Sequence, residues 1–264
     1  MRRIILLTTL FILVTAMTCS AHFLVMYTPE TLLDNGGTFT LKSMFVHPFE
    51  ASHSMELEKP NAFFVVNKGT KTDLLGTLKP ITWQSLETTA KAWETTYQVK
   101  GMGDYVFCMD PVAYYEKNEE KYIHQITKVI VNNGGLPTDW DAEIGLKTEI
   151  VPLDKPYALW TGNVFRGVVL SKGKPVPNIE IEVEYLNHAP NMELNKFEEK
   201  AAVKAPNDAF VTLLIKTDAN GEFTFGIPKA GWWGFAALGS GPDKKFKGKE
   251  LEQDAVIWIQ ARDM

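Results

Sequence analysis

The stretch Ile179-Glu180-Ile181-Glu182-Val183-Glu184-Tyr185 alternates apolar and acidic residues at every step. A period of two is typical of a β-strand, because successive side chains of a strand point to opposite faces of the sheet. The apolar residues would then face a core, and the three glutamates would face water. The stretch therefore predicts a strand in a sheet with one covered face and one solvated face.

The same kind of pattern recurs along the chain, and no long stretch with a helical period interrupts it. Turn-forming residues separate the apolar runs, and Asp218-Ala219-Asn220-Gly221 predicts a hairpin turn. The sequence predicts strands at 23–27, 38–46, 62–66, 92–99, 103–109, 122–131, 147–151, 164–170, 179–185, 210–216, 222–227, 231–236 and 255–260.

These strands fall into two groups on either side of Pro152–Pro156, which we interpret as a linker. We expect an all-β chain made of two antiparallel β-sandwich domains, at residues 22–153 and 160–264.

The composition is that of an ordinary globular protein. Of the 264 residues, 45% are hydrophobic and 22% are charged, which excludes a mainly disordered or collagen-like chain. The formal net charge of -5 provides no positive field for nucleic acid, so we expect no nucleic-acid partner. Neither a Gly-x-Ser-x-Gly string nor a glycine-rich phosphate loop occurs, and we do not expect an enzyme.

The first 21 residues have the layout of an export signal. Two arginines precede an apolar run over residues 4–14, and the small residues of Cys19-Ser20-Ala21 provide a cleavage site before His22. The apolar run is short for a spanning helix, which needs about 20 residues, and no later stretch could span a membrane. We expect residues 1–21 to be removed, which leaves a periplasmic or secreted protein without a membrane span.

The sequence contains two cysteines, and Cys19 would leave with the signal. The remaining Cys108 stands in the apolar run Tyr105-Val106-Phe107-Cys108-Met109, which predicts a buried and inert thiol. Because one thiol cannot form an internal disulfide, we expect a packed core to supply the stability of the mature chain.

The histidines carry most of the chemistry that the sequence offers. Signal removal would make His22 the first residue, and its α-amine and imidazole could then chelate one divalent ion. His47 and His53 lie six positions apart around a proline, which indicates a loop, with Glu50 and Met55 as further donors nearby. An exposed polar loop without a metal is the alternative interpretation of this stretch.

His124 lies in a predicted strand. It could be a further metal ligand, and the alternative is a core histidine with one satisfied hydrogen bond. His188 lies in the polar stretch Asn187-His188-Ala189-Pro190, which predicts a solvated side chain. Nitrogen-rich ligand sets suit Ni(II), Co(II), Cu(II) and Zn(II), whereas Ca and Mg prefer oxygen. The predicted metal ligands are His22, His47, His53, His124, Glu50 and Met55.

Longer motifs extend this picture. They are His22-Phe23-Leu24, Met44-Phe45-Val46-His47-Pro48-Phe49-Glu50, Gly103-Asp104-Tyr105-Val106-Phe107, His124-Gln125-Ile126-Thr127-Lys128-Val129, Leu159-Trp160-Thr161-Gly162-Asn163-Val164-Phe165 and Ala230-Gly231-Trp232-Trp233-Gly234-Phe235-Ala236. With these motifs the mature chain resembles the secreted nickel-uptake accessory proteins, which are NikK-like periplasmic components of energy-coupling-factor importers. Much of that family is described only as a domain of unknown function.

This resemblance implies a periplasmic protein that binds Ni(II), or alternatively Co(II), and assists its uptake by subunits of a membrane importer. It implies a β-sandwich first domain and a second domain similar to transthyretin-like or carboxypeptidase-regulatory-like modules. Position by position, the family pattern matches the six predicted ligands, and His188 lies outside its motifs.

Two other functions remain open. An N-terminal histidine with a second histidine on a β-sandwich also serves copper carriers and oxidative copper enzymes. A non-metal adaptor is the other alternative, because sandwiches of the second type often bind partners. Trp232 and Trp233 could form a ligand platform there, although the glycines on both sides favour a packing role.

We expect the protein isolated from an exporting host to begin at His22, because Ala21 completes the cleavage site. Intact-mass measurement and N-terminal sequencing check this directly. A chain that still carries residues 1–21 after export would contradict the predicted signal.

Overall fold

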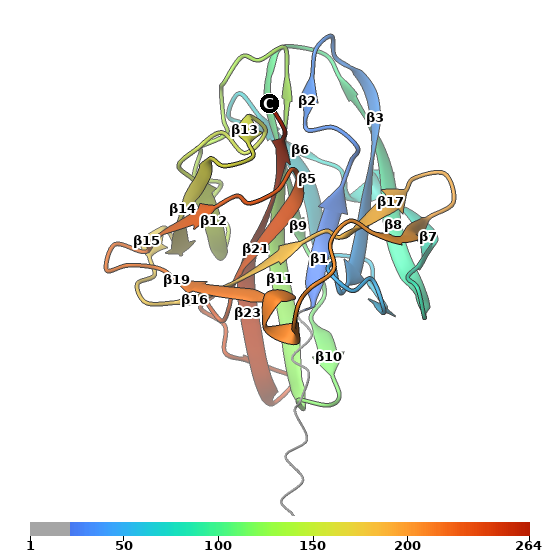
Figure 1. Cartoon of the computed structure of the whole chain (residues 1–264). Helices are drawn as coiled ribbons and strands as arrows, with labels where there is room; N and C mark the ends of the chain where they lie inside the picture. Colours follow the sequence, from blue (N-terminus) through green and yellow to red (C-terminus); the bar gives the residue numbers. More distant parts are fainter. Residues whose placement is uncertain (1–21) are drawn as a thin grey trace, which may run out of the picture.

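The computed structural model describes residues 22–264, so the predicted signal at 1–21 lies outside the described residues. Within the described range, nearly all regular elements are β-strands, and they form three main sheets (Figure 1). The prediction of an all-β chain is confirmed. Short 3-10 helices occur at Leu75–Thr77 (η1) and Asp208–Phe210 (η2). No helix in this part of the chain is both long enough and apolar enough to cross a membrane.

The first sheet runs in the order β1-β3-β8-β7-β18-β17, with β4 paired to β3. Its strands are β1 (Phe23–Tyr27), β3 (Gly37–Val46), β4 (Ser54–Met55), β7 (Lys79–Gln84), β8 (Thr89–Val99), β17 (His188–Asn191) and β18 (Lys196–Ala201). The third sheet runs in the order β12-β14-β15, with β20 paired to β14. Its strands are β12 (Thr148–Pro152), β14 (Val164–Ser171), β15 (Lys174–Pro175) and β20 (Glu222–Gly226).

The central sheet runs in the order β19-β16-β21-β23-β11-β9-β5-β6, and short strands extend it at β11 and β23. Its main strands are β5 (Ala62–Asn67), β6 (Thr70–Asp73), β9 (Gly103–Asp110), β11 (Lys121–Asn133), β16 (Glu180–Tyr185), β19 (Leu213–Lys216), β21 (Gly231–Ala237) and β23 (Lys249–Arg262). The short strands are β2 (Leu32–Leu33) and β10 (Tyr114–Glu116) beside β11, and β13 (Leu159–Trp160) and β22 (Lys245–Phe246) beside β23.

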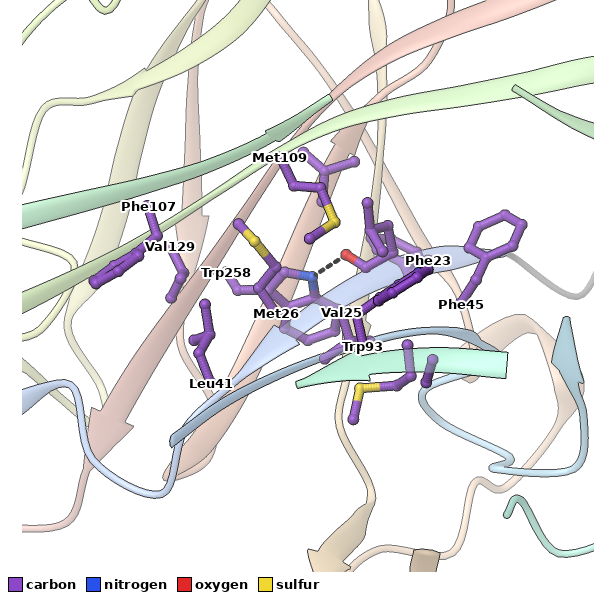
Figure 2. Packing of buried hydrophobic residues seen from close by; sticks show 14 of the residues in the cluster. Phe23, Val25, Met26, Leu41, Phe45, Trp93, Phe107, Met109, Val129 and Trp258 are labelled. Atoms are coloured by element: carbon purple, nitrogen blue, oxygen red, sulfur yellow. Dashed lines mark hydrogen bonds between the residues drawn. The ribbon is translucent and has the colours of Figure 1, made fainter. Parts of the chain in front are cut away.

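The two faces of the central sheet contribute to two hydrophobic cores. On one face, Val129 of β11 and Trp258 of β23 pack with Phe23 and other residues of the first sheet (Figure 2). On the opposite face, Ile130 of β11 packs with Phe165 and other residues of the third sheet. The central sheet is therefore the middle layer of the fold, covered on both sides.

Strands β11 and β23 join the two halves of the chain. They pair in parallel, in a register that runs from Tyr122↔Leu251 to Val129↔Trp258. Strands from both predicted domains, 22–153 and 160–264, thus share the central sheet, and both cores contain residues of both ranges. The division into two domains stays a prediction. Most other ladders are antiparallel, as expected for sandwich sheets.

The turn at Asp218 forms, because its carboxylate accepts the backbone N–H groups of Asn220 and Glu222. The hairpin predicted there is wrong, however. Strand β19 before the turn pairs with β16 in the central sheet, whereas β20 after it pairs with β14 in the third sheet. The turn therefore carries the chain from one layer to the next.

The alternating stretch forms β16, and its side chains Ile181 and Val183 are fully buried as predicted. The expectation that its glutamates all face water is wrong for Glu184, which is 1% exposed. Its carboxyl oxygens accept the backbone N–H of Phe49 at 3.3 Å and the hydroxyl of Thr212. The polar face of this strand is thus covered at its end by a loop that follows β3.

Cys108 in β9 is free and fully buried, as predicted. Burial raises the pKa of its thiol to about 12, so the thiol is protonated at neutral pH. The side chain therefore acts as a small apolar group within the core.

Gly234 of β21 lies opposite Trp258 of β23, and a methyl group at Gly234 would stand 2.6 Å from the indole ring. The indole is held in place because its Nε1 donates to the carbonyl of Leu24 at 3.0 Å (Figure 2). We expect Gly234→Ala to lower the free energy of unfolding by about 1–3 kcal/mol, the usual cost of overpacking a core. Urea denaturation measures this change.

Gly226→Ala in β20 is the matched control, because no atom lies within 4 Å of the position its methyl group would take. It should change the free energy of unfolding by about 0.5 kcal/mol or less. Equal stability of the two variants would contradict the packing of Trp258 against Gly234.

Burial raises the pKa of Glu184 to about 8, whereas an unfolded chain has a glutamate pKa of about 4.3. The stability supplied by the protonated form is therefore fully present below about pH 4 and is lost as the pH rises through 8. Glu184→Gln cannot ionise, so its advantage in free energy of unfolding should grow by about 4 kcal/mol from pH 5 to pH 9, because each pKa unit corresponds to about 1.4 kcal/mol. Denaturation curves at both pH values measure this. A constant difference between the two proteins would rule out a buried, protonated carboxyl.

Candidate metal centre

An open pocket of about 630 Å³ lies at the start of β1, beside the loop that follows β3 and the short strand β10. His22, His47, His53, Met55 and Glu116 contribute to its walls. We call these five residues the histidine pocket. The structure thus brings together four of the six ligands predicted from the sequence.

The pairing of β1 with β3 places the first two histidines side by side. Phe23 at the start of β1 is registered opposite Val46 at the end of β3. His22, which precedes Phe23, therefore lies next to His47, which follows Val46. The centroids of the two imidazole rings are 4.7 Å apart, with the rings nearly perpendicular.

The loop after β3 brings His53 back toward His47. The backbone N–H of Ala51 donates to the carbonyl of His47 at 2.8 Å, and Ala51 adopts the left-handed conformation with a φ of 50°. The ring centroids of His47 and His53 are 5.8 Å apart. The loop is followed by β4, which pairs with β3 and places Met55 opposite Phe45.

Burial decides the protonation of the inner histidines. It lowers the pKa of His47 to about 3, and a protonated His47 would also be repelled by the rings of His22 and His53 whenever these carry a proton. Burial also lowers the pKa of His22, although the carboxylate of Glu116 opposes the shift. His22 and His47 are therefore neutral at pH 7, which is the form of imidazole that binds metal ions.

Carboxylates contact the outer nitrogens of the pocket. Nε2 of His22 lies 3.2 Å from Oε2 of Glu116, and Nε2 of His53 lies 3.3 Å from Oε2 of Glu87. In residues 22–264, no three His, Cys, Asp or Glu side chains are arranged to hold a metal ion as they stand. An ion in the pocket would therefore have to replace these carboxylate contacts. The side chain of His53 is 49% exposed, so its ring has room to rotate.

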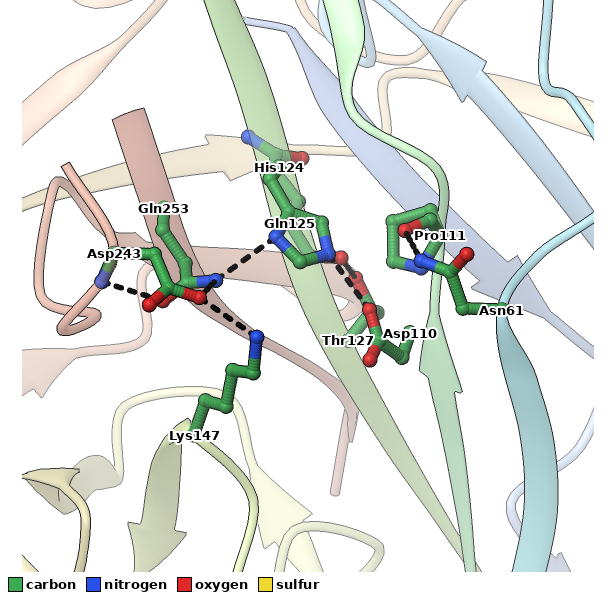
Figure 3. A network of polar contacts seen from close by, with 9 residues as sticks. All are labelled: Asn61, Asp110, Pro111, His124, Gln125, Thr127, Lys147, Asp243 and Gln253. Carbon is green, nitrogen blue, oxygen red and sulfur yellow. Dashed lines mark hydrogen bonds and ion pairs between the residues drawn. The ribbon is translucent and has the colours of Figure 1, made fainter. Parts of the chain in front are cut away.

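His124 lies outside the histidine pocket. Its side chain lies on the opposite face of β11 from that of its neighbour Gln125, because successive side chains of a strand alternate, and Gln125 donates to the carbonyl of His22. Figure 3 shows the His124 ring between Asp110 and Gln253. Nε2 donates to Oδ1 of Asp110 at 2.6 Å, and Nδ1 accepts from Nε2 of Gln253 at 3.0 Å. Both ring nitrogens take part in a polar network. This agrees with the alternative interpretation of His124 as a core histidine with satisfied hydrogen bonds.

Three other residues differ from the sequence-based picture. Glu50 is exposed and does not line the histidine pocket. The prediction of a solvated His188 is wrong: it is 6% exposed in β17, and its Nδ1 donates to the carbonyl of Glu198 at 2.8 Å. The sequence alone gives no reason to place Glu116 at the pocket. Glu116 reaches His22 because β10 pairs with β11 in a register that sets Glu116 opposite Lys121.

His22 also lines a second cavity, of about 330 Å³. The walls of this cavity carry Glu119, Glu180, Glu182 and Glu252, together with Lys121. Burial, reinforced by the charge of Glu252, raises the pKa of Glu182 to about 7. The excess of carboxylates favours positive charge near His22.

Comparison with solved structures includes several distant likenesses. The chain is similar to the D0-D1 domain of Intimin, with 12% identity, a TM-score of 0.21, and coverage of 91% of this chain and 100% of that chain. It is similar to Yersinia pseudotuberculosis adhesin InvE, with 13% identity, a TM-score of 0.23, and coverage of 88% and 58%. Titin domains I67-I69 give 7% identity, a TM-score of 0.22, and coverage of 91% and 65%. TM-scores at this level carry no argument about function.

The search of curated proteins finds no match to the chain. A family described as Domain of unknown function (DUF4198) matches residues 19–241. The match covers most of the chain and includes every residue of the histidine pocket. The chain therefore belongs to the DUF4198 family.

Proposed function

We propose that the histidine pocket binds a divalent transition-metal ion, Ni(II) or alternatively Co(II), and that the protein assists uptake of the ion by a membrane importer. The observation that carries the proposal is the meeting of His22, His47 and His53 around one open pocket. Imidazole nitrogen is a favoured ligand for these ions. The resemblance to nickel-uptake accessory proteins supports the choice of metal and of an importer as the partner, and the export signal supports a periplasmic location.

The pocket suits a cation at neutral pH. His22 and His47 are already neutral, so no proton has to leave their rings before an ion binds. The carboxylate of Glu116 stands beside His22 and is only 6% exposed, so it can offset the charge of a partly buried ion. The glutamates of the neighbouring cavity add to this negative potential.

Removal of residues 1–21 would add a further donor at the same place. The α-amine of a chain that starts at His22 is close in the covalent structure to the imidazole of the same residue. Two donors on one residue act at a high effective concentration, so the second bond to the ion forms readily. The complete site would then exist only after export.

Delivery of the ion would be an exchange of ligands, without catalysis. His53 is half exposed and forms the outer rim, whereas Met55 is 8% exposed and lies deeper. A receiving subunit of the importer would therefore displace His53 first. Acidification would also favour release, because imidazoles must lose their metal to bind protons.

Copper handling is a second candidate, and Met55 favours it. Its thioether belongs to a class of soft ligands that selects Cu(I), whereas Ni(II) is well served by imidazole alone. A pocket that binds Cu(I) in preference to Ni(II) would make the protein a copper carrier.

Calorimetric titration of the processed protein with Ni(II), Co(II), Cu(II) and Zn(II) tests the proposal. We expect one equivalent of Ni(II) to bind, and His47→Ala to weaken that binding by at least about tenfold, equivalent to about 1.4 kcal/mol. Binding should also weaken when one extra residue precedes His22, because the amine and the imidazole then belong to different residues.

His188→Gln is the matched control, since His188 is a buried histidine outside the histidine pocket. This variant should bind Ni(II) as the wild type does. Equal, weak binding of all four metals by every form would contradict a metal function, and a search for adaptor partners would then replace it.

A further inference from the structure

Gln125 of β11 is 4% exposed, and both ends of its side-chain amide bond the backbone at the start of β1. Its Oε1 accepts the N–H of Leu24 at 2.7 Å, and its Nε2 donates to the carbonyl of His22 at 2.7 Å. The orientation of the amide follows from these partners, because the N–H needs an acceptor and the carbonyl needs a donor.

These two hydrogen bonds are the ones that a neighbouring parallel strand would make with β1. In a parallel ladder, one residue bonds the carbonyl of a partner residue and the N–H of the residue two positions further on. Strand β1 is the edge of the first sheet, and Gln125 supplies that pair of bonds from its side chain. Trp258 of β23 adds a third bond, from its Nε1 to the carbonyl of Leu24.

Further polar contacts hold the side-chain amide of Gln125 in place. Its Nε2 also lies 3.3 Å from Oδ2 of Asp254, which is fully buried on β23. Oδ1 of Asp254 accepts the backbone N–H of Gly239 at 2.8 Å. The amide therefore has little freedom to turn away from His22. His22 precedes β1, and the ladder between β1 and β3 begins only at Phe23, so that ladder does not hold His22.

We propose that Gln125 is a positioning residue for the metal centre: by fixing the carbonyl of His22, it directs the imidazole, and the α-amine of the processed chain, toward the histidine pocket. This inference rests on the proposed function. A donor residue at a chain end otherwise loses much conformational freedom when an ion binds, and a backbone held beforehand lowers that cost. Residues that orient metal ligands typically affect metal affinity by about 10- to 100-fold.

The chain contains a matched control for this effect. Gln260 of β23 bonds the N–H of Thr31 at 3.0 Å and the carbonyl of Pro29 at 3.0 Å, in the same pattern. It holds the segment after β1, and it does not line the histidine pocket. Loss of the Gln260 amide should therefore loosen the N-terminal segment without moving His22.

The test compares Gln125→Met and Gln260→Met in exported protein whose N-terminus has been verified. Methionine keeps the length of the side chain and removes its amide. We expect Gln125→Met to bind Ni(II) about 10- to 100-fold more weakly than the wild type, and Gln260→Met to bind as the wild type does. The electron paramagnetic resonance spectrum with Cu(II) as a probe should also report fewer nitrogen ligands in Gln125→Met alone.

Should Gln125→Met fail to fold, Gln125→Asn provides the same test, because its amide stays polar but its side chain is one methylene too short to reach both Leu24 and His22. Unchanged Ni(II) affinity in a folded Gln125 variant would overturn the inference and leave the proposed function intact. An equal loss in the Gln125 and Gln260 variants would also overturn it, since general loosening would then be the cause. Absence of metal binding by the wild type would overturn the proposed function itself, and this inference with it.

Discussion

The parallel pairing of β11 with β23 is the interaction on which the other layers depend. With β9 on its other edge, β11 is an inner strand of the central sheet, and the outer sheets cover its two faces. Each face contacts one outer sheet through a polar side chain. Gln125 reaches β1 of the first sheet, while Lys128 forms an ion pair with Glu149 of β12 in the third sheet at 2.8 Å. Both partners of that ion pair are only 2% exposed, so each charge depends on the other. One strand thus orients the layers on both of its sides.

This arrangement explains the chemistry of the histidine pocket. The end of β3 and the start of β1 lie over the central sheet, where burial keeps His22 and His47 neutral. Carboxylates of β10 and of the neighbouring cavity supply negative charge at the same place. Neutral donors surrounded by negative charge favour a cation over an anion as the ligand. In the loop after β3, the His53 side chain is 49% exposed and lines the same pocket.

Much of the candidate site could be predicted from the sequence, because its residues are unusual in type and close in number. His47, His53 and Met55 stand within nine positions, and His22 stands beside a cleavage signal. The face of a strand to which a histidine belongs is harder to predict. His124 differs from Gln125 by one position, yet that step moves it to the opposite face of β11, away from the pocket. Glu116 reaches the pocket through the pairing of β10 with β11, and no local sequence pattern predicts that pairing.

The sequence by itself determined that the chain is all β and where most strands lie, because alternation with a period of two is a local property of the backbone. Strand β1 occupies the predicted residues, and the apolar residues of β16 are buried as expected. The tertiary structure decided which strands are neighbours, which of them pair in parallel, and what covers a polar face. Glu184 and His188 are buried for that reason. A period-two pattern reveals that two faces differ, but burial of the polar face depends on distant segments that pack against it.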